Sequence, residues 1–534
     1  MPTNSVPFRE THYFSNLICD YLDEKPEWQP FYNRFPKIEN FKAQIEEKRK
    51  TFSPQTRKSL VKSLNEQYKN VEASQLTFQN INALQNETTF TVTTGHQLNL
   101  FTGPLYFFYK IVSTINLCKE LKAAYPEFNF VPIYWMATED HDFEEINFFN
   151  FKNEKVRWDK EASGAVGELH LNEIEDVFHT FESKLGLGKY ANELKQLFKT
   201  AYLKHQTLTE ATRYLVNELF TEYGLVILDG NDKGLKAIFK PYIKNELLDK
   251  TAYKHVSETN EKIKKVNSDY TIQVNPREIN LFYLNQGIRE RIVEDKGQYM
   301  VLETNLNWDK ETLLKEVDNY PERFSPNVIL RPLYQEVILP NLCYIGGGGE
   351  LAYWFQLQSN FEANNVTFPI LLLRNSVLIT SQKQRSKLEK LDLKIADLFI
   401  DQDELVSKVT KQVSSIDIDF SEQKEHLKKQ FKDLYKLSEQ TDKSFVGAVS
   451  AQERKQIKGL EHLEKRLLKA QKRKYNERLD RVSKLQDELF PNKSLQERYA
   501  NFSEFYLVYG DQFIQLLVVN LQPLKGEFTI LNLD

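Results

Sequence analysis

The fold class is decided by the segment TTFTVTTGHQLNLFTGPLYFFYKIVSTINLCKELKAAYPEFNFVPIYWMATEDHDFEEINFF (88–149). Its start, TTFTVTTG (88–95), is rich in strand-forming residues and ends at a glycine. After Gly103-Pro104, apolar residues recur at helical spacing, and VPIYWMA (131–137) is a second run of strand length. A strand, a helix and a strand with ligand-type residues at both strand ends are typical of an open parallel sheet, whose ligands bind outside the carboxyl ends of the strands.

Three later runs extend the same pattern: GLVILDG (224–230), NVILRPLYQEVILP (327–340) and FPILLLR (368–374). We therefore expect an α/β protein with a Rossmann-like core. The predicted organisation is an N-terminal helical or mixed segment (1–84), the core (85–380) with helical or mixed insertions near 150–220 and 245–325, a coiled-coil hairpin (381–490) and a C-terminal return segment (491–534), in which FTILNLD (528–534) resembles a short strand.

The predicted hairpin lies in a stretch without proline, rich in Lys, Glu, Gln and Leu. Two long helices joined near 440–452 would form an antiparallel coiled coil, with a break near Lys474 and Tyr475. The second helix has a basic excess that suits either an RNA-binding arm or a solvated face, and the balanced whole-chain charge favours the solvated face. We expect a homodimer through an apolar seam formed by Leu460, Leu463, Leu467, Val482, Leu485 and Leu489.

The overall composition excludes several classes of protein. The 71 Lys and Arg against 75 Asp and Glu give a net charge of −4, which provides no bulk attraction for nucleic acid or an anionic membrane. Cys19, Cys118 and Cys343 are too few and too scattered for a disulfide framework or a four-cysteine zinc site, so we interpret Cys118 and Cys343 as packing residues. With no signal peptide and no apolar stretch of about 20 residues, a soluble cytoplasmic protein is expected.

The densest group of ionisable residues follows the 131–137 run. Five carboxylates and one imidazole fall within Glu139 to Glu145. An acidic surface loop is one interpretation, but the position at a strand end favours a functional cleft. The predicted roles are catalysis for Asp140, His141 and Asp142, and substrate binding for Glu139 and Glu145. His141 with an aspartate could also bind a metal, but two ligands from one loop do not make a site, so none is predicted.

Two glycine-containing segments are further candidates. Gly95-His96-Gln97 with Thr102-Gly103-Pro104 suits a phosphate or carboxylate bound at a helix N-terminus; alternatively, Gly95 is only a turn and His96 a packed residue. Gly346-Gly347-Gly348-Gly349 would let a ligand lie against bare backbone, with Glu350 and Tyr353 opening a helix at the rim; a flexible hinge is the alternative. With no P-loop and no GxGxxG after a strand, a dinucleotide oxidoreductase is not expected.

Taken in order, these motifs resemble the bacillithiol-synthesis cysteine ligase family. The family pattern is a TGQQ-like turn, FTGP, EDHDFEE, and then RP…Q…LP…Y-GGPGE-AYW. The corresponding residues here are Thr94-Gly95-His96-Gln97, Phe101-Thr102-Gly103-Pro104, Glu139 to Glu145, and Arg331-Pro332…Gln335…Leu339-Pro340…Tyr344 to Trp354. His96 stands where the pattern has Gln, and Gly348 where it has Pro.

This resemblance implies a Rossmann core akin to class I aminoacyl-tRNA synthetases and nucleotidyl transferases, with a dimerising coiled-coil arm. The implied activity adds L-cysteine to glucosaminyl-malate, the last step of bacillithiol synthesis. Because a free carboxylate must be activated, Mg-ATP is expected as a cosubstrate, and no tightly bound cofactor is expected. On this basis His96 or Gln97 would stabilise charge on a transferred phosphate, and His141 would be the acid or base.

Two other functions are compatible with the sequence. One is a non-catalytic coiled-coil scaffold whose degenerate Rossmann core senses a ligand. The other is a nucleotidyl transferase that acts on another small acid.

Overall fold

The computed structural model places both strand-like runs of the 88–149 segment in one parallel sheet. β2 (Thr89–His96) pairs with β3 (Asn129–Met136) in parallel register, with Gly95 opposite Trp135. The sheet order is β13-β12-β2-β3-β6, and its other strands are β6 (Val226–Asp229), β12 (Asn341–Gly346) and β13 (Ile370–Leu373). The strand order reverses between β2 and β12, as in a doubly wound fold. The predicted Rossmann-like core is confirmed.

The structure describes residues 4–268 and 270–533, and the chain divides into two units. The first unit consists of Met1–Arg9, Tyr13–Leu378 and Ser494–Leu531. The second consists of Glu10–His12, Ile379–Lys493 and Asn532–Asp534. The parallel sheet therefore belongs to the first unit, and the segment after residue 493 returns the chain to that unit.

Helices pack on the sheet because this contact removes their apolar side chains from water. α5 (Tyr106–Ala124) lies on β2 and β3, and α2 (Asn40–Thr51) lies on β12. Their buried side chains join those of the strands in one cluster that includes Cys118 and Cys343, which confirms the packing role predicted for these two cysteines.

The other helices of the first unit are α1 (Asn16–Leu22), α3 (Pro54–Gln67), α4 (Gln75–Ala83), α6 (Phe143–Ile146), α7 (Glu175–Leu185), α8 (Lys189–Leu203), α9 (Leu208–Phe220), α10 (Lys233–Asp249), α11 (Thr251–Val266), α12 (Lys310–Asn319), α13 (Arg331–Ile338), α14 (Gly348–Phe355), α15 (Gln358–Ala363), α21 (Gln496–Tyr499), α22 (Phe502–Tyr509) and α23 (Gln512–Asn520).

The strand-like interpretation of 327–340 is wrong in its main part. Residues 331–338 form α13, with Pro332 in the first turn, and the strand β12 begins only at Asn341. α13 buries Leu333, Tyr334 and Ile338. Its apolar residues come in two pairs separated by Gln335 and Glu336, and in so short a segment this pattern is easily confused with that of a strand.

The two insertions contain both helices and antiparallel strands. The first holds the hairpin β4 (Phe148–Phe151) with β5 (Glu154–Arg157), followed by α7 to α9. The second holds most of an antiparallel sheet of order β10-β9-β8-β7-β11. Its strands are β7 (Leu281–Asn285), β8 (Ile288–Asp295), β9 (Gln298–Val301), β10 (Asn307–Asp309) and β11 (Phe324–Pro326).

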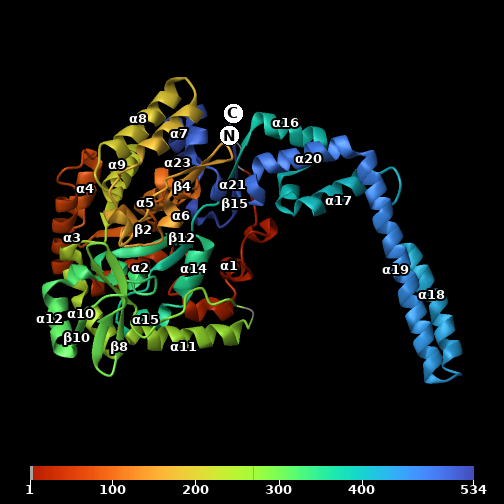
Figure 1. The fold of residues 1–534 in the computed structure, drawn as a ribbon, viewed down its shortest axis with the longest axis horizontal. Coiled ribbons are helices and arrows are strands. Elements are labelled where there is room, and N and C mark those ends of the chain that lie inside the picture. The colour runs from red at the N-terminus through yellow and green to blue at the C-terminus, as the bar shows by residue number, and fades with distance from the viewer. Residues whose placement is uncertain (1–3, 269, 534) are drawn as a thin grey trace. The chain divides into compact units, whose positions relative to one another are not determined.

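The second unit contains the predicted coiled coil. α18 (Ser421–Ser438) and α19 (Lys443–Lys474) run side by side as a hairpin, and α19 ends at the predicted break before α20 (Asn476–Leu489) (Figure 1). α20 packs instead on α16 (Gln382–Leu391) and α17 (Gln402–Val413). Val482, Leu485 and Leu489 are therefore buried within their own chain, and the C-terminal half of the predicted seam is not available to a second copy.

The end of the chain forms a strand, as predicted from FTILNLD. β15 (Phe528–Leu533) pairs antiparallel with β1 (Asn4–Val6), with Ile530 opposite Asn4, and β14 (Val377–Ser381) completes a three-stranded sheet of order β1-β15-β14. Across residues 4–268 and 270–533, every helix is too short or too polar to cross a membrane.

Candidate active site

A cavity of about 680 Å³ opens at the carboxyl ends of the parallel strands. Its lining includes residues at or just after the ends of β2, β3, β12 and β13. The place where the strand order reverses, between β2 and β12, is where open α/β sheets bind ligands. Many of the predicted site residues meet here: Gly95, His96, Gln97, Pro104, Glu139, Asp140, Gly347, Gly348, Gly349, Glu350 and Tyr353.

Six predicted residues do not line this cavity: Thr102, Gly103, His141, Asp142, Glu145 and Gly346. Thr102 and Gly103 lie in a loop whose backbone is fixed by hydrogen bonds from Asn501. The Asn501 side chain donates to the carbonyl oxygens of Phe101 and Gly103, at 2.9 and 2.7 Å. A Cβ on Gly103 would lie 2.6 Å from the Cβ of Asn99. Gly103 is thus required by the packing of the loop itself, and it lies outside the cavity lining.

A buried ion pair connects α5 to the glycine segment. The Lys110 ammonium lies 2.6 Å from Oε2 of Glu350 and donates to the Gly95 carbonyl oxygen at 2.7 Å. Burial lowers the pKa of Lys110. Burial raises the pKa of Glu350, but Lys110 and two further donors outweigh it, so the Glu350 pKa lies below its ordinary value. These contacts of Lys110 tie the end of β2 to the start of α14.

The other contacts of Glu350 explain the glycine segment. Its Oε2 accepts the N–H of Gly347 at 2.8 Å, and its Oε1 accepts the Tyr344 hydroxyl at 2.7 Å. The segment is the end of β12 followed by the N-terminus of α14, so the prediction that Glu350 and Tyr353 open a helix is confirmed. Gly95 also has a steric role, because a Cβ there would lie 3.3 Å from the Tyr344 hydroxyl.

Basic side chains are prominent in the cavity lining, and of its four arginines only Arg331 belongs to a motif that the sequence shares with the family pattern. Arg289, Arg331, Arg374 and Arg498 all line the cavity. Arg331 donates to the Tyr353 hydroxyl at 3.0 Å, and Arg374 is bound by Glu497 at 2.8 Å. Arg374 could have been found, because it directly follows the strand-like run FPILLL. Lys110 and Arg498 carry no comparable local signal, since only the tertiary fold brings them to the cavity.

His96 ends β2 and is 8% exposed. Its ring packs against Tyr106 and Phe107, and its Nε2 is buried without a hydrogen-bond partner among the described residues. Burial, and then the charges of Lys110 and Arg374, lower the pKa of His96 well below its ordinary value. The ring is therefore neutral at pH 7. It can exchange a hydrogen bond with a ligand but does not supply a positive charge.

The acidic residues of the cavity lining follow β3. Glu139 forms an ion pair with the buried Lys236, and Asp140 accepts a hydrogen bond from Gln97 at 2.9 Å. The same Gln97 amide also donates to Glu145 at 3.0 Å. Gln97 therefore joins two residues of the acidic cluster to the end of β2, although Glu145 itself lies outside the cavity lining.

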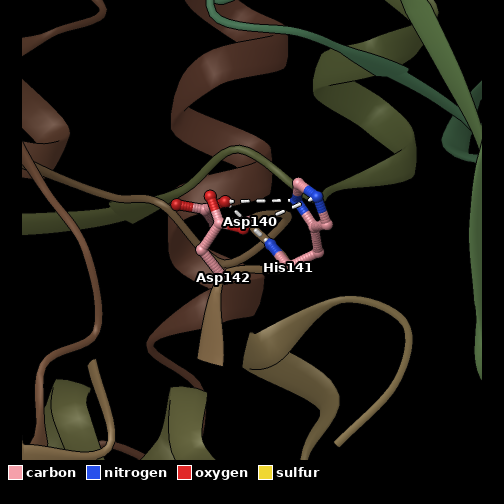
Figure 2. A group of neighbouring side chains, drawn as sticks. All are labelled: Asp140, His141 and Asp142. Carbon is pink, nitrogen blue, oxygen red and sulfur yellow. Dashed lines mark hydrogen bonds and ion pairs between the residues drawn. The ribbon is translucent and has the colours of Figure 1, made fainter. Parts of the chain in front are cut away.

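The remaining residues of the acidic cluster lie beside the cavity. Asp140, His141 and Asp142 have ligand atoms within 4.8 Å of one another (Figure 2). Nδ1 of His141 is 2.8 Å from a guanidinium nitrogen of Arg289, so that nitrogen is the acceptor of an arginine hydrogen bond. A cation bound at Nδ1 offsets part of the negative charge of the two aspartates and competes with a metal ion for that nitrogen. The donor set therefore does not fit a resident metal.

Comparison with known proteins identifies the family. Residues 1–375 match the family model "Bacillithiol biosynthesis BshC, N-terminal Rossmann-like domain", and residues 377–533 match "Bacillithiol biosynthesis BshC, C-terminal coiled-coil domain". The chain belongs to the BshC family. The predicted resemblance is thus confirmed over nearly the whole length.

Individual BshC relatives match from end to end. A protein of Christiangramia forsetii named "Putative cysteine ligase BshC" is 57% identical over 536 residues, covering 99% of each chain. A Bacillus cereus protein with the same name is 28% identical over 538 residues, covering 97% of this chain and 98% of its own. A solved structure described as a "putative arginyl t-RNA synthetase" of Campylobacter jejuni aligns at 10% identity over 83% of this chain and 94% of its own, with a TM-score of 0.20, which is too low to bear on the fold.

Proposed function

We propose that this protein is a cysteine ligase that joins L-cysteine to glucosaminyl-malate and so forms bacillithiol. The observation that carries the proposal is a single cavity lined by both carboxylates and arginines. Glu139 and Asp140 line it after β3, and Arg331, Arg374 and Arg498 line it from α13, the end of β13 and α21. The acceptor substrate has the matching charges, because glucosaminyl-malate carries an amine on the sugar and two carboxylates on the malate.

The charges suggest how the substrate lies. The carboxylates after β3 would attract the amine, and the arginines would bind the malate carboxylates, for which a planar guanidinium is well suited. His96, being neutral, would donate or accept one hydrogen bond. Glu139 and Asp140, the members of the acidic cluster that line the cavity, would orient this amine.

Formation of the amide requires that the cysteine carboxylate be activated. We propose Mg-ATP as the cosubstrate, with the magnesium ion arriving on the nucleotide. A carboxylate oxygen of cysteine would attack the γ-phosphorus of ATP and displace ADP, or attack the α-phosphorus and displace pyrophosphate. The sugar amine would then attack the carbonyl carbon, lose a proton and displace phosphate or AMP, respectively. The residues of the cavity would orient the two substrates and exclude water from the activated acyl group.

We further propose that the protein forms a homodimer through α18 and α19. Leu437 and Leu463 are 53% and 54% exposed, and Leu434 and Phe445 are also exposed on the same hairpin. A second copy would cover these apolar side chains. This seam is shorter than the one predicted, because its α20 portion is already buried.

Metabolite profiling of a deletion strain tests the proposed activity. The strain should accumulate glucosaminyl-malate and lack bacillithiol, and the wild-type gene should reverse both effects. A gene carrying Arg331→Met should not restore bacillithiol, although the protein should be present at normal abundance. Normal bacillithiol in the deletion strain would contradict the proposal.

A further inference from the structure

Arg374 follows β13 and is held on two sides of its guanidinium. One terminal nitrogen donates to the Asn375 carbonyl at 2.9 Å and to the Ser376 hydroxyl at 3.1 Å. The other donates to Glu497 at 2.8 Å. The Nε atom is different: it is buried and has no hydrogen-bond partner among the described residues, although Arg374 is only 4% exposed. A buried guanidinium N–H without an acceptor is costly unless a ligand accepts it.

The position of this Nε is informative. It lies 3.8 Å from the place where a Cβ on Gly347 would be, so it faces the bare backbone at the N-terminus of α14. The N–H groups of Gly348 and Gly349 belong to the first turn of that helix, where no backbone carbonyl of the helix can accept them. Gly349 has no atom within 4 Å of its Cβ position, and both glycines line the cavity. The N-terminal turn of α14 and Nε of Arg374 therefore border the same cavity, with Nε next to Gly347.

Glu497 sets this geometry from a distant part of the sequence. It belongs to α21, after the coiled coil, and its side chain is fully buried. One carboxylate oxygen binds Arg374, and the other accepts the N–H of Val377 at 2.9 Å. Because Glu497 is fixed by the backbone after β13, the guanidinium that it binds has little freedom to rotate.

We propose that the N-terminus of α14 and Nε of Arg374 form a subsite for one oxyanion group, a carboxylate or a phosphate, and that Glu497 is the positioning residue that holds Arg374 there. The inference rests on the proposed function, because both substrates bring such a group: glucosaminyl-malate has the malate carboxylates, and ATP has its phosphates. It extends the active site to the C-terminal return segment.

Calorimetric titration of the full chain with L-malate and, separately, with inorganic phosphate tests the subsite without relying on catalysis. The variants are Arg374→Lys, which keeps the charge and removes Nε–H; Glu497→Gln, which keeps the shape; and Gly347→Ala. An alanine at residue 347 fits beside Glu350 and Arg374 but covers Nε. Each variant should bind the accepted probe about tenfold more weakly or worse. The probe that binds identifies the oxyanion as carboxylate or phosphate.

Glu336→Gln is the matched control. Glu336 is buried as deeply as Glu497 and pairs with the buried Lys48 at 3.3 Å, but it does not line the cavity. It should lose thermal stability as Glu497→Gln does and yet bind the probe like the wild type. Equal loss of binding in Glu336→Gln, unchanged binding in Gly347→Ala and Arg374→Lys, or no binding of either probe by the wild type would overturn the subsite. Each of these results is independent of whether bacillithiol is formed.

Discussion

At the scale of single residues, the cavity depends on buried groups whose charges are set by their neighbours. His96 is the clearest case, because burial and two cations keep it neutral. Lys110 and Glu350 are the opposite case, since each keeps the other charged in a place where a lone charge would be costly. The free energy of unfolding should therefore depend on pH through His96 and on substitution of either member of the Lys110–Glu350 pair.

The first prediction concerns His96 and pH. Its pKa in the folded protein lies well below that in the unfolded chain, so protons bind the unfolded chain preferentially below about pH 6.5. This contribution to stability is complete above pH 6.5 and is lost as the pH falls. Between pH 6.5 and 5, the wild type should lose up to ~1.4 kcal/mol of unfolding free energy per pH unit more than His96→Gln. Urea denaturation of both proteins would show the difference, and parallel pH dependences would refute it.

The second prediction concerns Lys110 and Glu350. Glu350→Ala leaves a buried ammonium unpaired and should destabilise the first unit by about 3–5 kcal/mol. The double variant Lys110→Met with Glu350→Gln removes both charges and should recover part of that loss. Denaturant melts of the single and double variants measure the coupling. Additive losses would mean that the two side chains do not stabilise one another.

At the scale of elements, the carboxyl ends of the strands position the chemistry, and the loops after them are shaped by packing. The loop before α5 is an example. Gly103 has φ of 62° and faces Asn99, and Asn501 holds its carbonyl oxygen. The loop is therefore a structural support for Pro104 and α5 rather than a site that needs a bare backbone for a ligand.

Substitution of Gly103 tests this interpretation. Gly103→Val should destabilise the first unit by more than ~2 kcal/mol, because the new Cβ clashes with Asn99 and valine disfavours a positive φ. Gly526→Ala is the control: Gly526 also has a positive φ, 69°, but no atom lies within 4 Å of its Cβ position. That change should cost only about 1 kcal/mol of backbone strain. A stable Gly103→Val that has lost only ligand binding would restore the original ligand-site hypothesis.

Much of the sheet could be predicted, because β2 is rich in strand-forming residues, β3 and β6 are mostly apolar, and glycine or acidic residues lie at or just after the end of each strand. The position of β12 could not, because the short helix α13 directly precedes it and its interrupted apolar pattern also suits a strand. For the site, the sequence identified groups that are close in the chain, such as Glu139 with Asp140. It did not identify Arg498 or the link from Glu497 to Arg374, because these depend on a segment that returns after the coiled coil.

At the scale of the whole molecule, the hairpin of α18 and α19 keeps apolar side chains, such as Leu437 and Leu463, exposed to solvent. Deleting residues 416–474 with a short linker removes α18 and α19 but keeps α16, α17 and α20 packed together. The ends to be joined are close, since Ser415 hydrogen-bonds to Tyr475. Light scattering should give twice the chain mass for the wild type and a single chain mass for the deletion. A deletion variant that stays dimeric would contradict dimerisation through the hairpin.

The most direct test of the account is reconstitution with purified protein. L-cysteine, glucosaminyl-malate and Mg-ATP are incubated with the wild type, with Arg331→Met and with the control Glu336→Gln, and bacillithiol is quantified by mass spectrometry. The account predicts bacillithiol with stoichiometric consumption of ATP for the wild type and for the folded control. Arg331→Met should form at least about tenfold less. Failure of the folded wild-type protein to form bacillithiol from these three substrates, or equal activity of Arg331→Met, would contradict the assignment of ligation to this cavity.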